Sequence, residues 1–251
     1  MFHQVCLSLV GLLVLAQGAD SAVYFNIDFS SPLHQVGSQP TYGSGPGCPT
    51  RNWFGSPQVV STFGALTDQP LLMNTAGNPG SFYYDQFSLD LAYSQPTYHI
   101  AFDVYTEDLI GSRNQFAMLM DFAQVSVLQL FNNGVLVPAG PFNPPVRSSY
   151  VDRTLMHVDV SVDIAANRAV TLLNGVLIGD GKITANVVPG DLKRVRFSLG
   201  LLSSSDPQDN RSNVAVDNIV VTNGFLVPEG GTSTLIIVSV IGLTVRRRNR
   251  G

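Results

Sequence analysis

The sequence predicts an all-β protein whose antiparallel strands form a sandwich, and three observations point to this class. Apolar and polar residues alternate along most of the chain, which is typical of half-buried strands. Gly and Asn mark tight turns at spacings of about ten residues. Between the two ends of the chain, no segment shows the spacing of an amphipathic helix over several turns. Short strands joined by such turns are typical of antiparallel sandwiches.

The first 22 residues are predicted to be a signal peptide. Apolar residues 5–16 are followed by small residues that suit cleavage after Gly18, Ser21 or Ala22. No Lys or Arg precedes the apolar run, which is atypical of such peptides. A buried first strand is the alternative, but the leucine-rich run has a helical character. We therefore expect an exported protein.

Residues 23–223 are predicted to form one sandwich domain, because about 200 residues build one sizeable core. Residues 23–95 are rich in Gly, Pro, Ser and Gln and carry weaker strand patterns, so the path of 30–95 stays open. Asn132-Asn133-Gly134 predicts a tight turn, and Asn174-Gly175 predicts a type I′ hairpin. Clear strand patterns cover 99–105, 125–131, 155–164, 169–173, 176–178, 195–201 and 214–221.

Residues 224–251 have the composition of a membrane-held sorting segment. The apolar run 235–245 would reach about 16 Å as a helix, and about 24 Å with 230–234 added, against a hydrocarbon core of roughly 30 Å. The arginines after it would hold that end on the cytoplasmic side. An ordinary tail anchor and a buried terminal strand are the alternatives. The residues that carry the interpretation are Val227, Pro228, Glu229, Gly230, Gly231, Arg246, Arg247 and Arg248.

This tail resembles the bacterial PEP-CTERM sorting signal. Its Val-Pro-Glu at 227–229, short transmembrane helix and terminal arginine cluster follow that pattern, whereas Gly-Gly-Thr-Ser-Thr at 230–234 replaces the usual Pro-Ser-Thr. The resemblance implies export, processing by an exosortase-type enzyme and contact with the membrane until processing. It also implies a place in the bacterial cell envelope, at the cell surface or in an extracellular matrix.

The central region resembles concanavalin A-like jelly-roll domains of the laminin-G kind. The residues that carry the resemblance are Phe102-Asp103-Val104-Tyr105, the hairpin at Asn174-Gly175 and Val-Asp-Asn-Ile at 216–219. In such domains the last strand returns beside the first. The resemblance therefore implies that 23–29 pairs near 214–222 in an antiparallel jelly-roll β-sandwich.

No catalytic constellation is apparent in the sequence, so we expect a protein that is not an enzyme. Concanavalin A-like glycanases carry alternating acids on one strand, and Asp159 and Asp163 are the nearest match. Four positions along a strand separate them by about 13 Å, which is too far for a retaining pair. We expect both on a solvated outer face. The two glutamates of the chain, Glu107 and Glu229, argue against a glutamate-based glycosidase.

The histidines and cysteines suggest no further chemistry. His99 and His157 lie in predicted strands without the spacing of zinc ligands, and we expect ordinary strand histidines. Cys6 is removed with the signal peptide, which leaves Cys48 as an unpaired thiol in a loop. A disulfide within the mature chain is therefore not expected.

Two candidate binding regions remain. The loop 203–213 is rich in carboxylates and amides. Its residues Asp206, Asp209 and Asn210 could hold calcium, which is the one cofactor that the sequence suggests. A solvated hairpin loop is the alternative. For sugars, flat rings cover pyranose faces. The candidates are Trp53 and Phe54, whose neighbours are typical of an exposed loop, with Tyr83 and Tyr84; core aromatics are the alternative.

The composition limits the classes of function that fit the chain. The net charge of −4 becomes more negative once the tail arginines are removed, which argues against nucleic acid as a partner. A non-catalytic envelope or matrix protein with a lectin-like domain that binds extracellular polysaccharide or another glycan fits best. A secreted polysaccharide hydrolase or lyase and a purely structural surface protein are the alternatives.

Overall fold

The computed structural model describes residues 22–30, 32–75, 83–91, 96–120, 125–138, 148–182, 194–201 and 212–225. These residues contain β-strands and no helix, as the sequence predicts. Within these ranges no helix is long and apolar enough to cross a membrane. The strands are β1 (Val23–Ile27), β2 (Arg51–Phe54), β3 (Gln58–Val59), β4 (Leu71–Asn74), β5 (Tyr83–Asp90), β6 (Thr97–Glu107), β7 (Asn114–Met120), β8 (Val125–Phe131), β9 (Val135–Pro138), β10 (Ser148–Ser149), β11 (Met156–Asp163), β12 (Arg168–Leu173), β13 (Val176–Lys182), β14 (Arg194–Leu201) and β15 (Asn213–Thr222).

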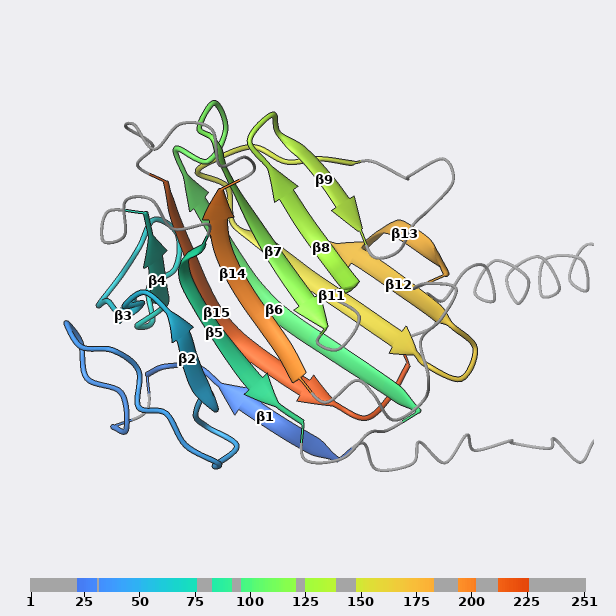
Figure 1. Ribbon diagram of the computed structural model, residues 1–251, viewed down its shortest axis with the longest axis horizontal. Helices are drawn as coiled ribbons and strands as arrows, with labels where there is room; N and C mark the ends of the chain where they lie inside the picture. Colours follow the sequence, from blue (N-terminus) through green and yellow to red (C-terminus); the bar gives the residue numbers. More distant parts are fainter. Residues whose placement is uncertain are drawn as a thin grey trace, which may run out of the picture.

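The strands form two antiparallel sheets that pack face to face (Figure 1). The eight-stranded sheet has the order β13-β12-β11-β6-β15-β4-β3, and β1 pairs with β15. The seven-stranded sheet has the order β10-β9-β8-β7-β14-β5-β2. The expected pairing of the first and last strands is confirmed, since Val23 lies opposite Thr222 and Ile27 opposite Ile219. The chain is therefore an antiparallel jelly-roll β-sandwich.

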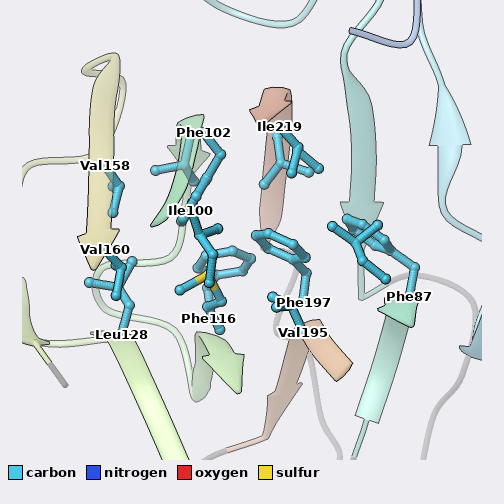
Figure 2. Packing of buried hydrophobic residues seen from close by; sticks show 14 of the residues in the cluster. Phe87, Ile100, Phe102, Phe116, Leu128, Val158, Val160, Val195, Phe197 and Ile219 are labelled. Atoms are coloured by element: carbon cyan, nitrogen blue, oxygen red, sulfur yellow. The ribbon is translucent and has the colours of Figure 1, made fainter. Parts of the chain in front are cut away.

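The core lies between the sheets and follows the period-two pattern of the strands. On β6, Ile100 and Phe102 point inward and are fully buried. Phe197 on β14 stacks on Phe87 of β5, with ring centroids 4.9 Å apart, and meets the edge of Phe102 at 5.1 Å (Figure 2). Aromatic pairs of this geometry add about 0.5–1.5 kcal/mol each to the free energy gained from burial. Because these rings come from both sheets, they join the two layers.

Both turns predicted from the sequence are present. Asn174 and Gly175 have φ of 50° and 76° and join β12 to β13, which is the conformation that a type I′ hairpin requires. Gly134, with φ of 75°, closes the turn between β8 and β9. Asn and Gly are the residues that most readily adopt positive φ, so these connections follow from local sequence.

The Val-Asp-Asn-Ile segment of β15 forms a β-bulge. Asp217 lies opposite Asp103 and Val220 opposite Ala101, so β15 carries one extra residue here. Asn218 occupies the left-handed region with φ of 51°, which Asn tolerates. The extra residue lets Val216 and Ile219 both face the core, and both are fully buried. The bulge thereby turns Asp217 and Asn218 to the outer face.

A buried carboxylate links the two sheets near β2. Asp85 of β5 accepts hydrogen bonds from the backbone N–H groups of Ser56 and of Asn74, both at 2.7 Å. Asn74 belongs to β4 in the opposite sheet, so the Asp85 side chain spans the sandwich. Burial raises the pKa of Asp85, while the two hydrogen bonds act to lower it. We call Asp85, Ser56 and Asn74 the inter-sheet clasp.

Candidate functional site

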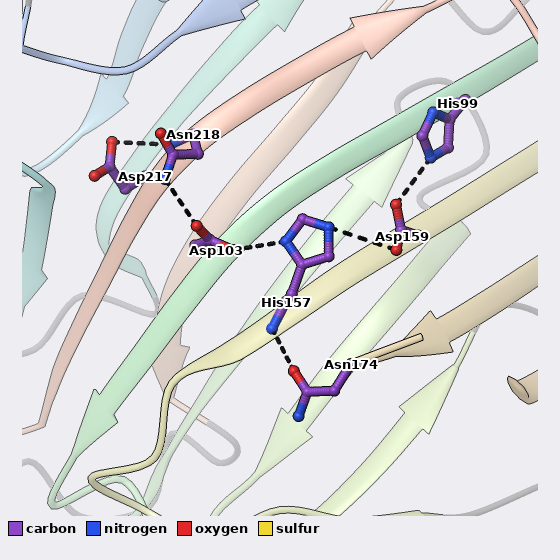
Figure 3. A network of polar contacts seen from close by, with 7 residues as sticks. All are labelled: His99, Asp103, His157, Asp159, Asn174, Asp217 and Asn218. Atoms are coloured by element: carbon purple, nitrogen blue, oxygen red, sulfur yellow. Dashed lines mark hydrogen bonds and ion pairs between the residues drawn. The ribbon is translucent and has the colours of Figure 1, made fainter. Parts of the chain in front are cut away.

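A network of polar side chains lies on the outer face of the eight-stranded sheet (Figure 3). Because Ile100 and Phe102 of β6 and Val158 and Val160 of β11 face the core, the residues between them face outward. Strand pairing then sets His157 directly opposite Asp103. We call this network the polar strip; its members are His99, Asp103, His157, Asp159, Asn174, Asp217 and Asn218.

His157 is the most exposed ring of the polar strip and lies between two carboxylates. Its Nδ1 is 2.6 Å from Asp103 Oδ1, and its Nε2 is 3.5 Å from Asp159 Oδ2. The side chain is 48% exposed. Asn174 holds the strand in place because its side-chain oxygen accepts the His157 backbone N–H at 2.8 Å. The hairpin turn predicted from Asn174-Gly175 therefore also orders the strip.

Asp159 contacts both histidines. The Nε2 of His99 lies 3.0 Å from Asp159 Oδ1, while His157 faces the other oxygen. The hydrogen bond with His99 lowers the pKa of Asp159, burial opposes that shift, and the charges of the two histidines add to it. Asp159 and Asp163 do lie in the outward register that the sequence predicts. Asp159 contacts both histidine rings and its side chain is only 16% exposed, so it is less solvated than the sequence suggests.

Asp217 lies at the buried end of the polar strip. Its side chain is 1% exposed, since the neighbouring part of this face is covered by Phe63 and Leu66, which pack on Tyr105 and Ala215. Burial raises the pKa of Asp217 to about 7, with the charges of three further aspartates adding to the shift and a hydrogen bond from the Asn218 backbone opposing it. Those aspartates are Asp103, Asp68 and Asp28.

The polar strip offers several hydrogen-bonding groups on the outer face of the sheet. Its carboxylates, imidazoles and the Asn218 amide, which donates to Asp103 at 2.8 Å, are suited to sugar hydroxyls. Ser161 lies opposite His99 but is fully buried, so a substrate cannot reach its hydroxyl. No three His, Cys, Asp or Glu side chains in the described ranges are arranged to hold a metal ion.

Sequence reasoning missed the polar strip because its contacts depend on strand register. His99 with Asp103, and His157 with Asp159, each share one face of a strand, a pattern visible in the sequence. The pairing of β6 with β11, which are separated by four other strands in the chain, is not visible there. Two short His/Asp alternations on strongly predicted strands were the signal that could have suggested it.

The predicted sugar-stacking residues lie on neighbouring strands of the seven-stranded sheet. Trp53 and Phe54 belong to β2, whereas an exposed loop was expected, and that expectation is wrong. The segment is a strand because its backbone pairs with β5, where Phe54 lies opposite Gln86. Tyr83 and Tyr84 begin β5. Strand pairing thus places the two aromatic pairs on adjacent strands, although their side chains lie outside what the structure describes.

A second group of polar side chains lies in the outward register of β2, β5 and β14, where Gln86, Ser88 and Ser198 are buried and Arg51 is exposed. Phe87 and Leu89 of β5 face the core, as do Val195 and Phe197 of β14, so the alternating residues face outward. Arg196 lies opposite Ser88 and Ser198 opposite Gln86. Asp90 accepts from both Arg51 and Arg194. We call this group the β5–β14 patch; it consists of Arg51, Gln86, Ser88, Asp90, Arg194, Arg196 and Ser198.

Several predicted sites lie outside the described residues. They are residues 1–21 of the signal peptide, the calcium candidates Asp206, Asp209 and Asn210, and the whole sorting signal from Val227 to Arg248 with its helix. Cys48 lies within the described part and is a free, buried thiol in the loop between β1 and β2, as expected for an unpaired cysteine.

Comparisons with known proteins identify the fold. No protein-family model matches the chain, and no curated protein matches it. Solved structures do resemble it. One is a structure described by the dependence of botulinum neurotoxin type C cell entry on interaction with two ganglioside molecules. It has a TM-score of 0.56 and 10% identity over 83% of this chain and 49% of that chain.

Two related structures are similarly distant. The binding domain of botulinum neurotoxin DC in complex with rat synaptotagmin II has a TM-score of 0.55 and 11% identity, over 82% of this chain and 49% of that chain. The same domain in complex with SialylT has a TM-score of 0.50 and 11% identity, over 71% and 43%. The chain therefore spans half or less of the solved structures it resembles. At such identities the likeness establishes the fold alone, which is an antiparallel jelly-roll β-sandwich.

Proposed function

We propose that this is an exported, non-catalytic protein of the bacterial envelope or extracellular matrix whose β-sandwich binds carbohydrate. The observation that carries the proposal is the pairing of β2 with β5, because it places Trp53 and Phe54 beside the strand that holds Tyr83 and Tyr84. Aromatic rings cover the apolar faces of sugars, and neighbouring polar groups bind their hydroxyls. Arg51 on β2 and Asp90 on β5 supply such polar groups, with side chains 49% and 23% exposed.

The structural neighbours support a glycan ligand. One is a neurotoxin structure described through its interaction with gangliosides, and another is a binding domain in complex with SialylT. A shared sandwich does not transfer a ligand by itself, since one fold hosts many functions. The proposal therefore rests on the combination of aromatic and polar residues on β2 and β5.

A glycan array tests the proposal directly. We expect saturable binding of the purified protein to at least one glycan, and Trp53→Ala should weaken that binding by about tenfold, the loss of one stacking contact. The matched control is Leu177→Ala, which shortens an exposed apolar side chain on the other sheet and should bind like the wild type. Running the array with calcium and with chelator tests Asp206, Asp209 and Asn210. Absence of binding to every glycan would contradict the proposal and leave a structural surface role.

The proposal that the protein is sorted to the envelope rests on the C-terminal segment of the sequence. The pattern from Val227 to Glu229, the apolar run and the arginine cluster have the order of an exosortase-processed tail. We expect a chain that lacks 227–251 to be released in soluble form from bacteria with this pathway, while the full chain fractionates with the membrane before processing. Replacing Arg246, Arg247 and Arg248 by Gln is the matched variant that keeps the apolar run. Equal fractionation of all three chains would remove the sorting hypothesis.

A further inference from the structure

The connection between β3 and β4 folds back as a hairpin over the outer face of the eight-stranded sheet. Two backbone hydrogen bonds between Phe63 and Leu66, of 2.9 and 3.0 Å, close its tip. At its base, the Gln69 N–H donates to the Ser61 carbonyl at 3.3 Å. We call residues 61–69 the lid.

A small apolar cluster holds the lid against the sheet. The Phe63 ring meets the Tyr105 ring edge-on, with centroids 5.8 Å apart, and Leu66 packs on Tyr105 and Ala215. These residues form a cluster apart from the main core between the sheets. Apart from Phe63, Leu66 and Gln69, the side chains of the lid are exposed. A segment with so little buried surface is of the kind that opens locally at low free energy.

Gln69, where the lid joins β4, is strained in the closed position. Its φ of 53° lies in the left-handed region, which is unfavourable for a residue other than glycine, asparagine or aspartate. Its side-chain oxygen is buried and has no hydrogen-bond partner within the described ranges. Both features cost free energy while the lid is closed, and opening would give the side chain access to water. The position of Gln69 suits a hinge.

Asp217 lies beside the surface that the lid covers. It follows Ala215 by two residues, so both face outward on β15, and its side chain is 1% exposed. Three carboxylates act on it: Asp103 from β6, Asp68 from the lid itself and Asp28 from the segment after β1. Beyond Asp103, His157 is the next charged partner on this face (Figure 3). Because Asp68 belongs to the lid, an ionised Asp217 repels the segment that covers it.

We propose that residues 61–69 form a pH-responsive lid, which closes over the outer face while Asp217 is protonated and lifts when Asp217 is ionised. A buried carboxylate is costly unless water reaches it, and opening this small hairpin admits water without unfolding the sandwich. Lifting the lid uncovers Tyr105, which lies on the same face as Asp103 of the polar strip. The surface beside the polar strip therefore differs between acidic and neutral conditions. This inference goes beyond the proposed glycan binding and does not depend on it.

Amide exchange at Phe63 and Leu66 measures the opening of the lid. The pKa of Asp217 is about 7 with the lid closed and returns to about 4 when water reaches the side chain. Closure is therefore complete below about pH 4, weakens by about tenfold per pH unit up to about pH 7 and is constant above. For the purified full-length protein, we expect protection factors, corrected for intrinsic exchange rates, to fall by about a hundredfold from pH 5 to pH 7. They should then stay level to pH 9.

Three variants assign this response. Asp217→Asn is neutral at every pH, so the amides of the lid should keep their acidic protection up to pH 9. Asp108→Asn alters a carboxylate that is 62% exposed and should behave like the wild type. Gly64→Ala should lower protection at every pH, because a Cβ at Gly64 would lie 2.1 Å from a ring carbon of Tyr105 and φ there is 57°.

Two further readings separate local opening from unfolding of the whole domain. The Asn167 amide, which donates to Ile164 in the turn between β11 and β12, should show no fall in protection with pH. Low concentrations of urea should leave exchange in the lid unchanged, because local opening exposes little surface. Protection at Phe63 and Leu66 that is constant with pH, or that falls equally in Asp217→Asn, would overturn the proposal. A fall that the β6 amides match and that urea accelerates would also overturn it, since Asp217 would then be reached only by global unfolding.

Discussion

Asp217→Asn is expected to stabilise the protein at pH 8 by about 4 kcal/mol and to have little effect near pH 4. The pKa of Asp217 is raised to about 7 by burial and by neighbouring carboxylates, against about 4 in the unfolded chain. Each unit of difference corresponds to about 1.4 kcal/mol. The folded protein therefore binds this proton more tightly, so its stability is complete below about pH 4 and falls as the pH rises to about 7. Asparagine is neutral throughout and keeps an oxygen for the Asn218 N–H.

Urea unfolding of both proteins from pH 4 to pH 8 measures the effect as a difference that widens with pH. Asp108→Asn is the control, because that side chain is 62% exposed and its positive φ suits asparagine equally well. The difference in unfolding free energy between wild type and Asp108→Asn should not widen from pH 4 to pH 8 as it does for Asp217→Asn. A constant difference between wild type and Asp217→Asn across the range would show that Asp217 is ionised in the folded protein at neutral pH. It would also show that repulsion between Asp217 and Asp103 does not destabilise the folded protein.

Asp85→Ala is expected to destabilise the fold by about 2–4 kcal/mol. The substitution leaves the backbone N–H groups of Ser56 and Asn74 without their acceptor, and each unsatisfied buried donor costs about 1–3 kcal/mol. It also removes a side chain that connects the seven-stranded sheet to β4 of the other sheet. Loss of the inter-sheet clasp should therefore loosen the segment that carries β2 and β3.

Asp85→Asn provides the graded comparison for this prediction. Its amide oxygen still accepts a hydrogen bond, so the loss should be smaller than for alanine. Denaturant unfolding measures the stability, and hydrogen exchange at the Asn74 and Ser56 amides reports the clasp itself. Faster exchange at these two positions with little change at the β6 amides would show that the inter-sheet clasp stabilises the structure locally. Equal stability of wild type and Asp85→Ala would show that the two N–H groups find water or other acceptors.

Several parts of the fold could be predicted because they depend on local properties. The strand over 125–131 is β8, residue for residue, and the inward positions of β11 are those that the alternation indicates. The first and last strands pair as the resemblance to jelly-roll domains implies. The weak region 30–95 contains β2 to β5, which alternation alone did not reveal. Two of these strands are four residues or fewer at the edge of a sheet, too short for a periodic pattern to be distinguished from a loop.

The candidate site could be predicted less completely. The aromatic residues on β2 and β5 were identified from the chemistry of sugar binding, but not their position on paired strands. His157 and Asp103 were not connected at all, nor was the arginine group around Asp90. In each case the residues are distant in sequence and meet through backbone pairing.

The sequence by itself determined the all-β class, the two turns at Gly134 and Asn174-Gly175, and which face of each strong strand is apolar. These properties depend on φ preferences and side-chain alternation within a few residues. The tertiary structure decided the register of β6 against β11, the burial of Asp217 beneath a covered part of the sheet, and the convergence of Arg51, Arg194 and Arg196 on the strands beside β5. These features arise from contacts between distant segments, whose free energy depends on the packing of the whole sandwich and not on any local pattern.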